Sequence, residues 1–132
     1  MAIRLLLDTH IWLWMQQDKD RIPSPVRRRL SRDSVSLYLS AACVMEISIK
    51  LSIGKLRIGV PISELVERLL SQGAIPLPVG IDHALTAGAL PLHHRDPFDR
   101  TLVAQAQVEG LTLVTADPRI MQYDVPTIDA RK

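Results

Sequence analysis

Acidic side chains follow two short apolar stretches of the sequence. Asp8 comes directly after the run Ile3–Leu7. Asp117 comes two residues after the run Leu111–Thr115. Both runs are too short for a helix and consist mostly of apolar residues, which favours strands buried in a parallel sheet. Because ligands bind at the carboxyl edge of such sheets, we expect both carboxylates at the edge where a site can form.

Two further acids are placed where they can reach the same edge. Glu46 lies about one turn into a predicted helix that follows the second strand, and Asp99 lies at the start of the helix that precedes the Leu111–Thr115 strand. Several carboxylates in a partly buried site repel one another, and a divalent cation removes that repulsion. Oxygen ligands without cysteines or spaced histidines favour Mg²⁺ or Mn²⁺ over zinc.

Each of these acids also has a purely structural interpretation. Asp8, Asp99 and Asp117 stand where an N-cap carboxylate would accept hydrogen bonds from free backbone N–H groups. Glu46 has Lys50 four residues further on, which is the spacing of an ordinary helix ion pair. The neighbours of Glu46 are apolar, however, so a carboxylate at that position needs a specific role. From the residues alone both interpretations stay open.

Predicted strands and helices alternate along the chain, which favours an α/β layer structure around a parallel sheet with right-handed crossovers. Ser24 and Pro25 resemble an N-cap and a first helical residue, and so do Asp117 and Pro118 before a short final helix. The predicted strands are Ile3–Leu7, Val35–Leu39, Leu111–Thr115 and, at a sheet edge, Ala74–Val79; the predicted helices are His10–Gln17, Ser24–Arg32, Ala41–Leu56, Ser63–Gln72, Ile81–Leu90 and Phe98–Glu109.

Composition limits the class of protein. The 132 residues are 47% hydrophobic, and 16 Lys and Arg against 14 Asp and Glu give a formal net charge of +2. That content is enough for one domain with its own core, which we expect to span residues 1–132, and it excludes collagen-like and disordered chains. Cys43 is the only cysteine, so an intrachain disulfide is excluded and a reducing cytoplasm is expected. No stretch of about 18 uncharged apolar residues occurs, so we expect no membrane span.

Four short segments, in this order and spacing, together resemble the PIN-domain endoribonucleases, in particular the VapC-like toxins of type II toxin–antitoxin systems. The segments are Leu5–His10, Glu46–Lys50, His94–Arg100 and Leu113–Asp117. The resemblance implies a three-layer α/β sandwich with a central parallel sheet of four or five strands flanked by helices. It also implies that the acids of the family fall on Asp8, Glu46, Asp99 and Asp117, with Thr115 as a polar residue beside them.

The function implied by the resemblance is metal-dependent hydrolysis of RNA phosphodiester bonds. One or two Mg²⁺ ions, or Mn²⁺, would be held by the four acids, and Lys50, Arg95 and Arg100 are candidates to hold flanking phosphates. The resemblance further implies a homodimer that a cognate antitoxin protein inhibits. Asp96 stands before Pro97 and is interpreted as a helix cap, with a contact to metal or substrate as the alternative. The alternative function is a non-catalytic PIN-fold module that binds RNA or protein and keeps its acids as caps.

Overall fold

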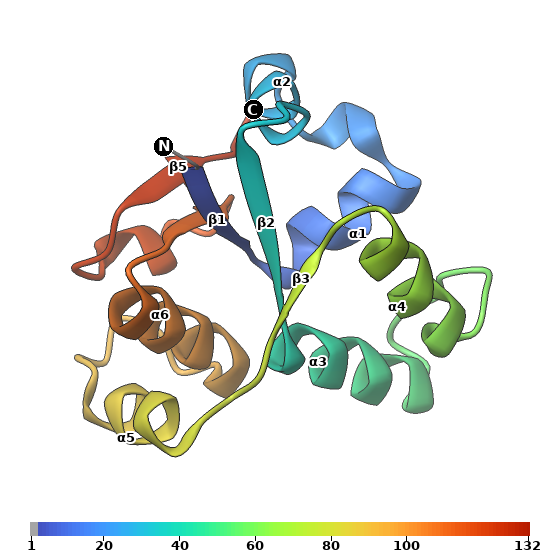
Figure 1. Ribbon diagram of the computed structural model, residues 1–132. Coiled ribbons are helices and arrows are strands. Elements are labelled where there is room, and N and C mark those ends of the chain that lie inside the picture. Colours follow the sequence, from blue (N-terminus) through green and yellow to red (C-terminus); the bar gives the residue numbers. More distant parts are fainter. Residues whose placement is uncertain (1–2) are drawn as a thin grey trace.

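The computed structural model describes residues 3–132 and has a sheet of five parallel strands at its centre (Figure 1). The strand order across the sheet is β3-β2-β1-β4-β5. The strands are β1 (Ile3–Leu7), β2 (Val35–Ser40), β3 (Ile75–Leu77), β4 (Thr112–Thr115) and β5 (Thr127–Asp129). The chain therefore builds outward from β1 to β2 and β3, returns, and continues on the other side of β1 with β4 and β5.

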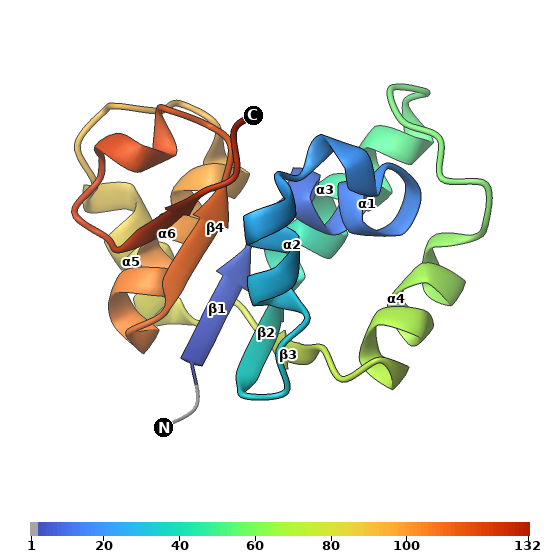
Figure 2. The same cartoon turned by 90° about the horizontal axis from the view of Figure 1, so that it is seen from above.

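Six α-helices cover the two faces of this sheet within the described residues. They are α1 (Thr9–Gln17), α2 (Ser24–Leu30), α3 (Ala41–Ser52), α4 (Ile62–Ser71), α5 (Ile81–Ala89) and α6 (Pro97–Glu109). Figure 2 shows α5 and α6 on one side of the sheet and α1, α2 and α4 on the other. The protein thus has the predicted α/β fold, with the sheet as the middle of three layers. Within residues 3–132, no helix has the length and apolar character needed to cross a bilayer.

The sequence of the central strand explains its place in the fold. Leu5, Leu6 and Leu7 are all buried, although successive residues of a strand point to opposite faces. A strand that is apolar on both faces is stable only where helices cover both sides, as they do around β1. Leu5 pairs with Leu37 of β2 and with Thr112 of β4, so β1 has hydrogen-bonded neighbours on both edges.

Two details of the predicted elements are wrong. Ser24 is not an N-cap: α2 begins at Ser24, and the preceding residue is Pro23, whose φ of −54° directs the chain into the helix and whose carbonyl accepts the first helical N–H. No α-helix follows Asp117, where the chain forms a turn and a short 3₁₀ segment, Ile120–Gln122, before β5. Strand β5 was not predicted, because it has three residues and follows Pro126 directly.

Arg100 organises the loop between α5 and α6. Its guanidinium donates to backbone carbonyl oxygens of Ala87, Leu90, Pro91 and His94 at distances from 2.8 to 3.1 Å. Tyr123 joins the same cluster, because its hydroxyl donates to the Pro91 carbonyl at 2.8 Å and accepts from the His94 N–H at 2.9 Å. Carbonyls at a helix end and in a loop need such donors when they are shielded from water. Arg100 and Tyr123 therefore hold the segment that carries His94.

Replacing Arg100 should destabilise the protein. Arg100→Met keeps the length of the side chain but removes the side-chain donor to the carbonyls of Ala87 and Leu90 and leaves only Tyr123 near those of Pro91 and His94. We expect a loss of about 2 kcal/mol or more in the free energy of unfolding. Urea unfolding followed by circular dichroism measures it. Arg95→Met is the matched control, because Arg95 is exposed and its removal should change stability by less than about 0.5 kcal/mol. Equal urea midpoints for the two variants would contradict the role given to Arg100.

Candidate metal centre

The first two acids lie where the order of the strands reverses. β1 and β4 are neighbours in the sheet, but the chain leaves them in opposite directions, toward β2 and toward β5. Asp8 follows β1 directly, and Asp117 lies two residues beyond β4. Diverging connections at such a reversal leave a crevice at the carboxyl edge of the sheet. Both carboxylates thus lie at the edge where the sequence predicts them.

Asp8 caps a helix with one oxygen and contacts β4 with the other. Its side chain is buried, with 3% of its surface exposed. Oδ1 accepts a hydrogen bond from the Ile11 N–H at 3.0 Å and so caps α1, while Oδ2 accepts one from the Thr115 hydroxyl at 2.5 Å. Burial raises the pKa of the Asp8 carboxyl, and these two hydrogen bonds oppose that shift. The capping interpretation is confirmed for Oδ1 and leaves Oδ2 directed to the strand ends.

Thr115 connects the two strand-end acids. Its hydroxyl donates to Asp8, and the same oxygen accepts a hydrogen bond from the Asp117 backbone N–H at 3.0 Å. One carboxylate oxygen of Asp117, Oδ1, accepts from the Arg119 N–H at 2.9 Å and shapes the turn after β4. The Thr115 hydroxyl therefore sets the position of Asp8 relative to the turn that carries Asp117. Thr115 lies beside these acids, as the resemblance implies.

Glu46 is buried, and both of its oxygens are hydrogen-bonded. The Thr9 hydroxyl donates to Oε1 at 2.7 Å, and the Lys50 ammonium donates to Oε2 at 2.6 Å. The hydrogen bond to Glu46 raises the pKa of Lys50, whose side chain is 35% exposed. The ion pair that the spacing indicates is thus present. It does not exclude metal binding, because each carboxylate oxygen has a second lone pair.

Asp96 and Asp99 have separate positions at the start of α6. Asp96 is the N-cap, since its Oδ1 accepts from the Phe98 N–H at 2.8 Å and from the Asp99 N–H at 3.3 Å, with Pro97 opening the helix. Asp99 occupies the third helical position. Burial and, to a lesser extent, the negative charges of Asp96, Glu46, Asp8 and Asp117 together raise the pKa of the Asp99 carboxyl to about 8. The pKa of Asp99 shows that these acids share one region of negative potential.

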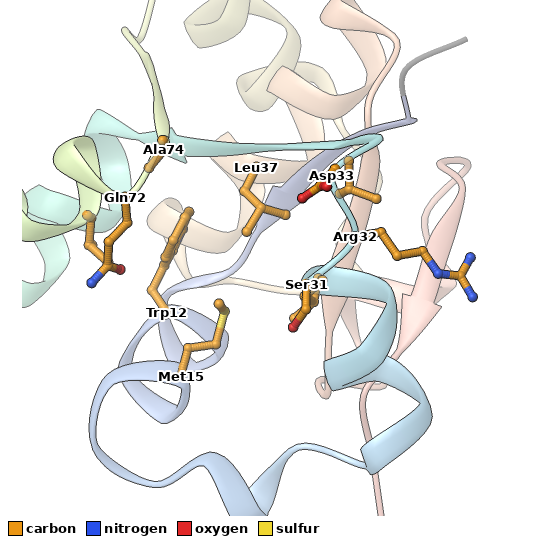
Figure 3. A pocket seen from close by; sticks show the side chains of 12 residues that line it. Trp12, Met15, Ser31, Arg32, Asp33, Leu37, Gln72 and Ala74 are labelled. Atoms are coloured by element: carbon orange, nitrogen blue, oxygen red, sulfur yellow. The ribbon is translucent and has the colours of Figure 1, made fainter.

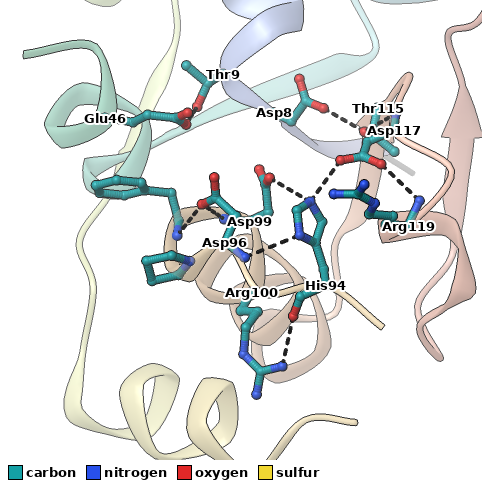
Figure 4. Close-up of polar contacts among 12 residues, drawn as sticks. Asp8, Thr9, Glu46, His94, Asp96, Asp99, Arg100, Thr115, Asp117 and Arg119 are labelled. Carbon is teal, nitrogen blue, oxygen red and sulfur yellow. Dashed lines mark hydrogen bonds and ion pairs between the residues drawn. The ribbon is translucent and has the colours of Figure 1, made fainter. Parts of the chain in front are cut away.

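His94 is the residue at this site that the sequence analysis missed. Its Nε2 lies 3.0 Å from Asp99 Oδ2 and 2.8 Å from Asp117 Oδ2 (Figure 4). Its Nδ1 accepts a hydrogen bond from the Asp96 N–H at 3.2 Å, so the proton of the neutral ring is on Nε2, between the two carboxylates. In the sequence, His93 and His94 are adjacent and lack the spacing of a metal-binding pair; the fold shows that His94 is buried and His93 is exposed.

The residues at this edge fit a divalent cation. Ligand atoms of His94, Asp99 and Asp117 all lie within 4.8 Å of one another. Asp8 and Glu46 lie outside this tight group, but Figure 4 shows their carboxyl groups facing it across the same space. Carboxylate oxygens are hard ligands, and the pKa of Asp99 is raised by burial and by neighbouring negative charges that a cation would neutralise. The acidic cluster could therefore hold a metal ion.

A second group with ligand-type side chains lies between α5 and α6 and comprises Asp82, His83 and Glu109. Its contacts are those of a helix cap. His83 Nδ1 accepts from the Gly80 N–H at 2.9 Å, and His83 Nε2 lies 3.1 Å from Glu109 Oε2. Both nitrogens of the ring are thus engaged within the protein, which explains the group without a metal.

Comparison with known proteins gives a family and a fold. A family model described as the PIN domain matches residues 5–126. Among curated proteins, none matches the chain. VapBC2 from Rickettsia felis, solved bound to a DNA fragment from its promoter, is similar with a TM-score of 0.72 and 14% identity, over 96% of this chain and 98% of that chain.

Two other solved structures have the same fold. DNA-bound VapBC from Salmonella typhimurium gives a TM-score of 0.68 at 20% identity, over 97% of this chain and 98% of that chain. FitAcB from Neisseria gonorrhoeae gives 0.63 at 22% identity, over 96% of this chain and 97% of that chain. At these identities the likeness shows the fold alone.

The stability of the metal-free protein should fall as the pH rises from about 5 to about 8. The pKa of Asp99 is about 8 in the folded protein against an ordinary value of 3.8, so the folded state binds more protons than the unfolded state between these values. Melting temperatures in EDTA should decrease over this range for the wild type and less for Asp99→Asn. Asp129→Asn is the control: the pKa of Asp129 is lowered by Arg131, so its titration lies below this range. Equal slopes for the wild type and Asp99→Asn would contradict the shift.

Asp96 and Asp99 should respond differently to substitution. Asp96→Ala removes the N-cap of α6 and should cost about 1 kcal/mol of stability, while added Mg²⁺ still raises the melting temperature. Asp99→Asn should leave the metal-free protein about as stable at pH 7, because a carboxyl with a pKa of about 8 is mostly protonated and neutral there, and it should abolish the response to Mg²⁺. Thermal melts with and without Mg²⁺ measure both effects. If Asp96→Ala is the variant that stops responding to Mg²⁺, the two assignments are reversed.

Proposed function

The chain belongs to the PIN domain family, and on this basis we propose that it is a one-domain, metal-dependent endoribonuclease that hydrolyses RNA phosphodiester bonds. The observation that supports the proposal most directly is the Asp99 carboxyl, whose pKa is raised by burial and by the surrounding acids. Shifts of this kind in a cleft are typical of functional sites. We propose Mg²⁺ as the ion, with Mn²⁺ as a substitute, because the ligands are carboxylates.

In this proposal Asp8, Glu46, Asp99 and Asp117 hold the ion and form the catalytic centre. When bound, Mg²⁺ supplies positive charge to the scissile phosphate and lowers the pKa of a coordinated water. The chain itself positions the ligands. Thr115 orients Asp8, Thr9 and Lys50 orient the two oxygens of Glu46, and His94 holds Asp99 and Asp117 together.

Basic residues near the acids are proposed to hold flanking phosphates, which positions RNA without reading its sequence. Arg95 is exposed and directly precedes the α6 cap, and the side chain of Lys50 is partly exposed beside Glu46. Both remain candidates. Arg100 is not proposed to hold a phosphate, because its guanidinium already donates hydrogen bonds to carbonyls at the end of α5 and in the α5–α6 loop.

We also propose that the protein is the toxin of a type II toxin–antitoxin pair, acts in the cytoplasm, forms a homodimer and is inhibited by a cognate antitoxin. The similar structures from Rickettsia felis and Salmonella typhimurium are VapBC complexes, and a further one, at 15% identity and a TM-score of 0.66, is a toxin–antitoxin complex from Klebsiella pneumoniae. Large apolar side chains exposed on this chain support protein partners. They include Met45 of α3 and, on α5, Ile81 at 82% and Leu85 at 72% exposure.

The alternative function, a non-catalytic PIN-fold module that binds RNA or protein, has one observation in its favour. Asp8 and Asp96 both cap helices, so two of the acids at this edge have a structural use that needs no metal. The alternative gives no reason for the hydrogen bond of Thr115 to the second oxygen of Asp8, or for His94 lying between two further carboxylates.

Cleavage of RNA by the purified protein tests the proposal. Single-stranded RNA should be cut in Mg²⁺ and left intact in EDTA. Asp8→Asn should lower the cleavage rate by more than about 100-fold, beyond the usual effect of losing an outer partner of a metal ligand, with an unchanged circular dichroism spectrum. Asp33→Asn is the matched control, because Asp33 is exposed and precedes β2 at the opposite edge of the sheet. RNA binding without cleavage by the wild type, in any divalent metal, would support the non-catalytic module instead.

A further inference from the structure

A hollow of about 330 Å³ opens beside two of the proposed metal ligands. Its lining comes from two parts of the chain, the segment that follows β1 and the turn that follows β4. The residues that line it are Asp8, His10, Trp14 and Arg21 from the first part and Ala116, Asp117 and Pro118 from the second. The hollow is thus continuous with the acidic cluster.

Three side chains on the α1 side of the hollow lie against one another, and we call them the His10–Trp14–Arg21 wall. The ring centroids of His10 and Trp14 are 6.0 Å apart, with their planes at 49°. The guanidinium carbon of Arg21 lies 4.6 Å from the centroid of the Trp14 ring. His10 and Trp14 are four residues apart and therefore share one face of α1, next to the N-cap Asp8. The wall is a row of flat groups that begins beside Asp8, one of the proposed metal ligands.

The wall is accessible, although Trp14 also packs against the edge of the hydrophobic core. His10 is exposed, and Trp14 is half-buried. Within the part of the chain that the structure describes, the acidic neighbour of the Arg21 guanidinium is Asp18, at 4.0 Å, with both side chains more than half exposed. An exposed ion pair of that length contributes little to stability. The ion pair with Asp18 therefore does not account for the position of Arg21 over the Trp14 ring.

The other tryptophan of α1 behaves differently. Trp12 is buried, with 3% of its surface exposed. Figure 3 shows it with Met15 and Leu37 at a second hollow, of about 400 Å³, which includes Ser31 of the chain after α2 and Gln72 of the chain after α4. Residues two apart in a helix point about 200° apart, so Trp12 packs into the core while Trp14 lies beside the acids. Trp12 is a matched internal control for Trp14.

We propose that the His10–Trp14–Arg21 wall binds the base of a nucleotide next to the scissile phosphate of single-stranded RNA. The inference rests on the proposed function, because it takes the acidic cluster as the place of that phosphate. Bases of single-stranded RNA stack on aromatic side chains and on guanidinium planes. Every base has a flat face, so such a wall adds affinity for unpaired RNA and does not select one base.

Charge supports the same occupant. Arg21 places a cation in the hollow that Asp8 and Asp117 also line, so an RNA strand that runs from the acidic cluster along the wall meets positive charge next to aromatic rings. This combination of a cation for the backbone and flat groups for the bases is typical of single-strand binding sites. Base-paired RNA keeps its bases stacked on one another and cannot place one on the wall.

The test compares an oligoadenylate RNA with an abasic ribose-phosphate strand of the same length, both fluorescein-labelled, by fluorescence anisotropy in Ca²⁺. Trp14→Leu should weaken binding of the RNA about tenfold and leave binding of the abasic strand unchanged. Trp14→Phe, which keeps an aromatic ring, should restore most of the affinity. Trp12→Phe should bind RNA like the wild type, and circular dichroism checks that every variant is folded.

The chain has 2 tryptophans, so in the Trp12→Phe variant Trp14 is the sole indole. Its fluorescence should be quenched by the RNA and not by the abasic strand. An equal loss of affinity for both strands in Trp14→Leu would overturn the proposal, since Trp14 would then act on the backbone or on the fold. Unchanged RNA affinity in Trp14→Leu, unquenched Trp14 fluorescence, or no binding of RNA by the wild type would overturn it as well.

The two proposals fail separately in these measurements. Trp14-dependent binding of RNA without any Mg²⁺-dependent cleavage would leave the base-binding wall standing and overturn the nuclease function. Cleavage in Mg²⁺ with the same KM and kcat in Trp14→Leu as in the wild type would leave the nuclease function standing and overturn the wall.

Discussion

Thr115 donates its hydroxyl hydrogen to Asp8 and accepts a hydrogen bond from the backbone of Asp117. This bridge forms only because β1 and β4 are adjacent and parallel, with both carboxyl ends at one edge of the sheet. Similar contacts hold other acids of the site. Glu46 of α3 accepts a hydrogen bond from Thr9 of α1, and His94 Nε2 is hydrogen-bonded to Asp117 and lies 3.0 Å from Asp99 Oδ2. These donors offset part of the repulsion between the carboxylates when no cation is bound.

At the carboxyl edge of the sheet, the side chain of Asp8 both caps a helix and belongs to the proposed metal site. A carboxylate has two oxygens, and the Asp8 N-cap uses one of them on α1 while the other contacts Thr115. The cap and the hydrogen bond from Thr115 together restrict the Asp8 side chain to one orientation. At α6 the two tasks are divided, since Asp96 caps the helix and thereby leaves Asp99 directed toward the other acids.

The sequence predicts what depends on local pattern and misses what depends on distant contacts. The acids at the ends of β1 and β4 follow from apolar runs and the chain reversal that α/β folds require, and the boundaries of most helices follow from their caps. His94 was missed because its burial comes from Tyr123 and Arg100, which are remote in the sequence or in the next helix. Arg100 looks like a free surface cation for the same reason, since a sequence does not show which carbonyls surround a guanidinium. Strand β5 has no apolar run long enough to mark it and exists because β4 offers it an edge.

The bridge between Asp8 and Thr115 joins residues 107 positions apart in the chain. A ribosome makes β1 before β4, so β1 cannot pair with β4 until more than a hundred further residues have been added. Contacts between such distant positions form late in folding, because a long loop has to close before they can. A nascent chain that still lacks β4 has Asp8 but neither Thr115 nor Asp117 to set beside it. The acidic centre is consequently assembled only after β4 has been made, and a polypeptide that stops before β4 has no complete site.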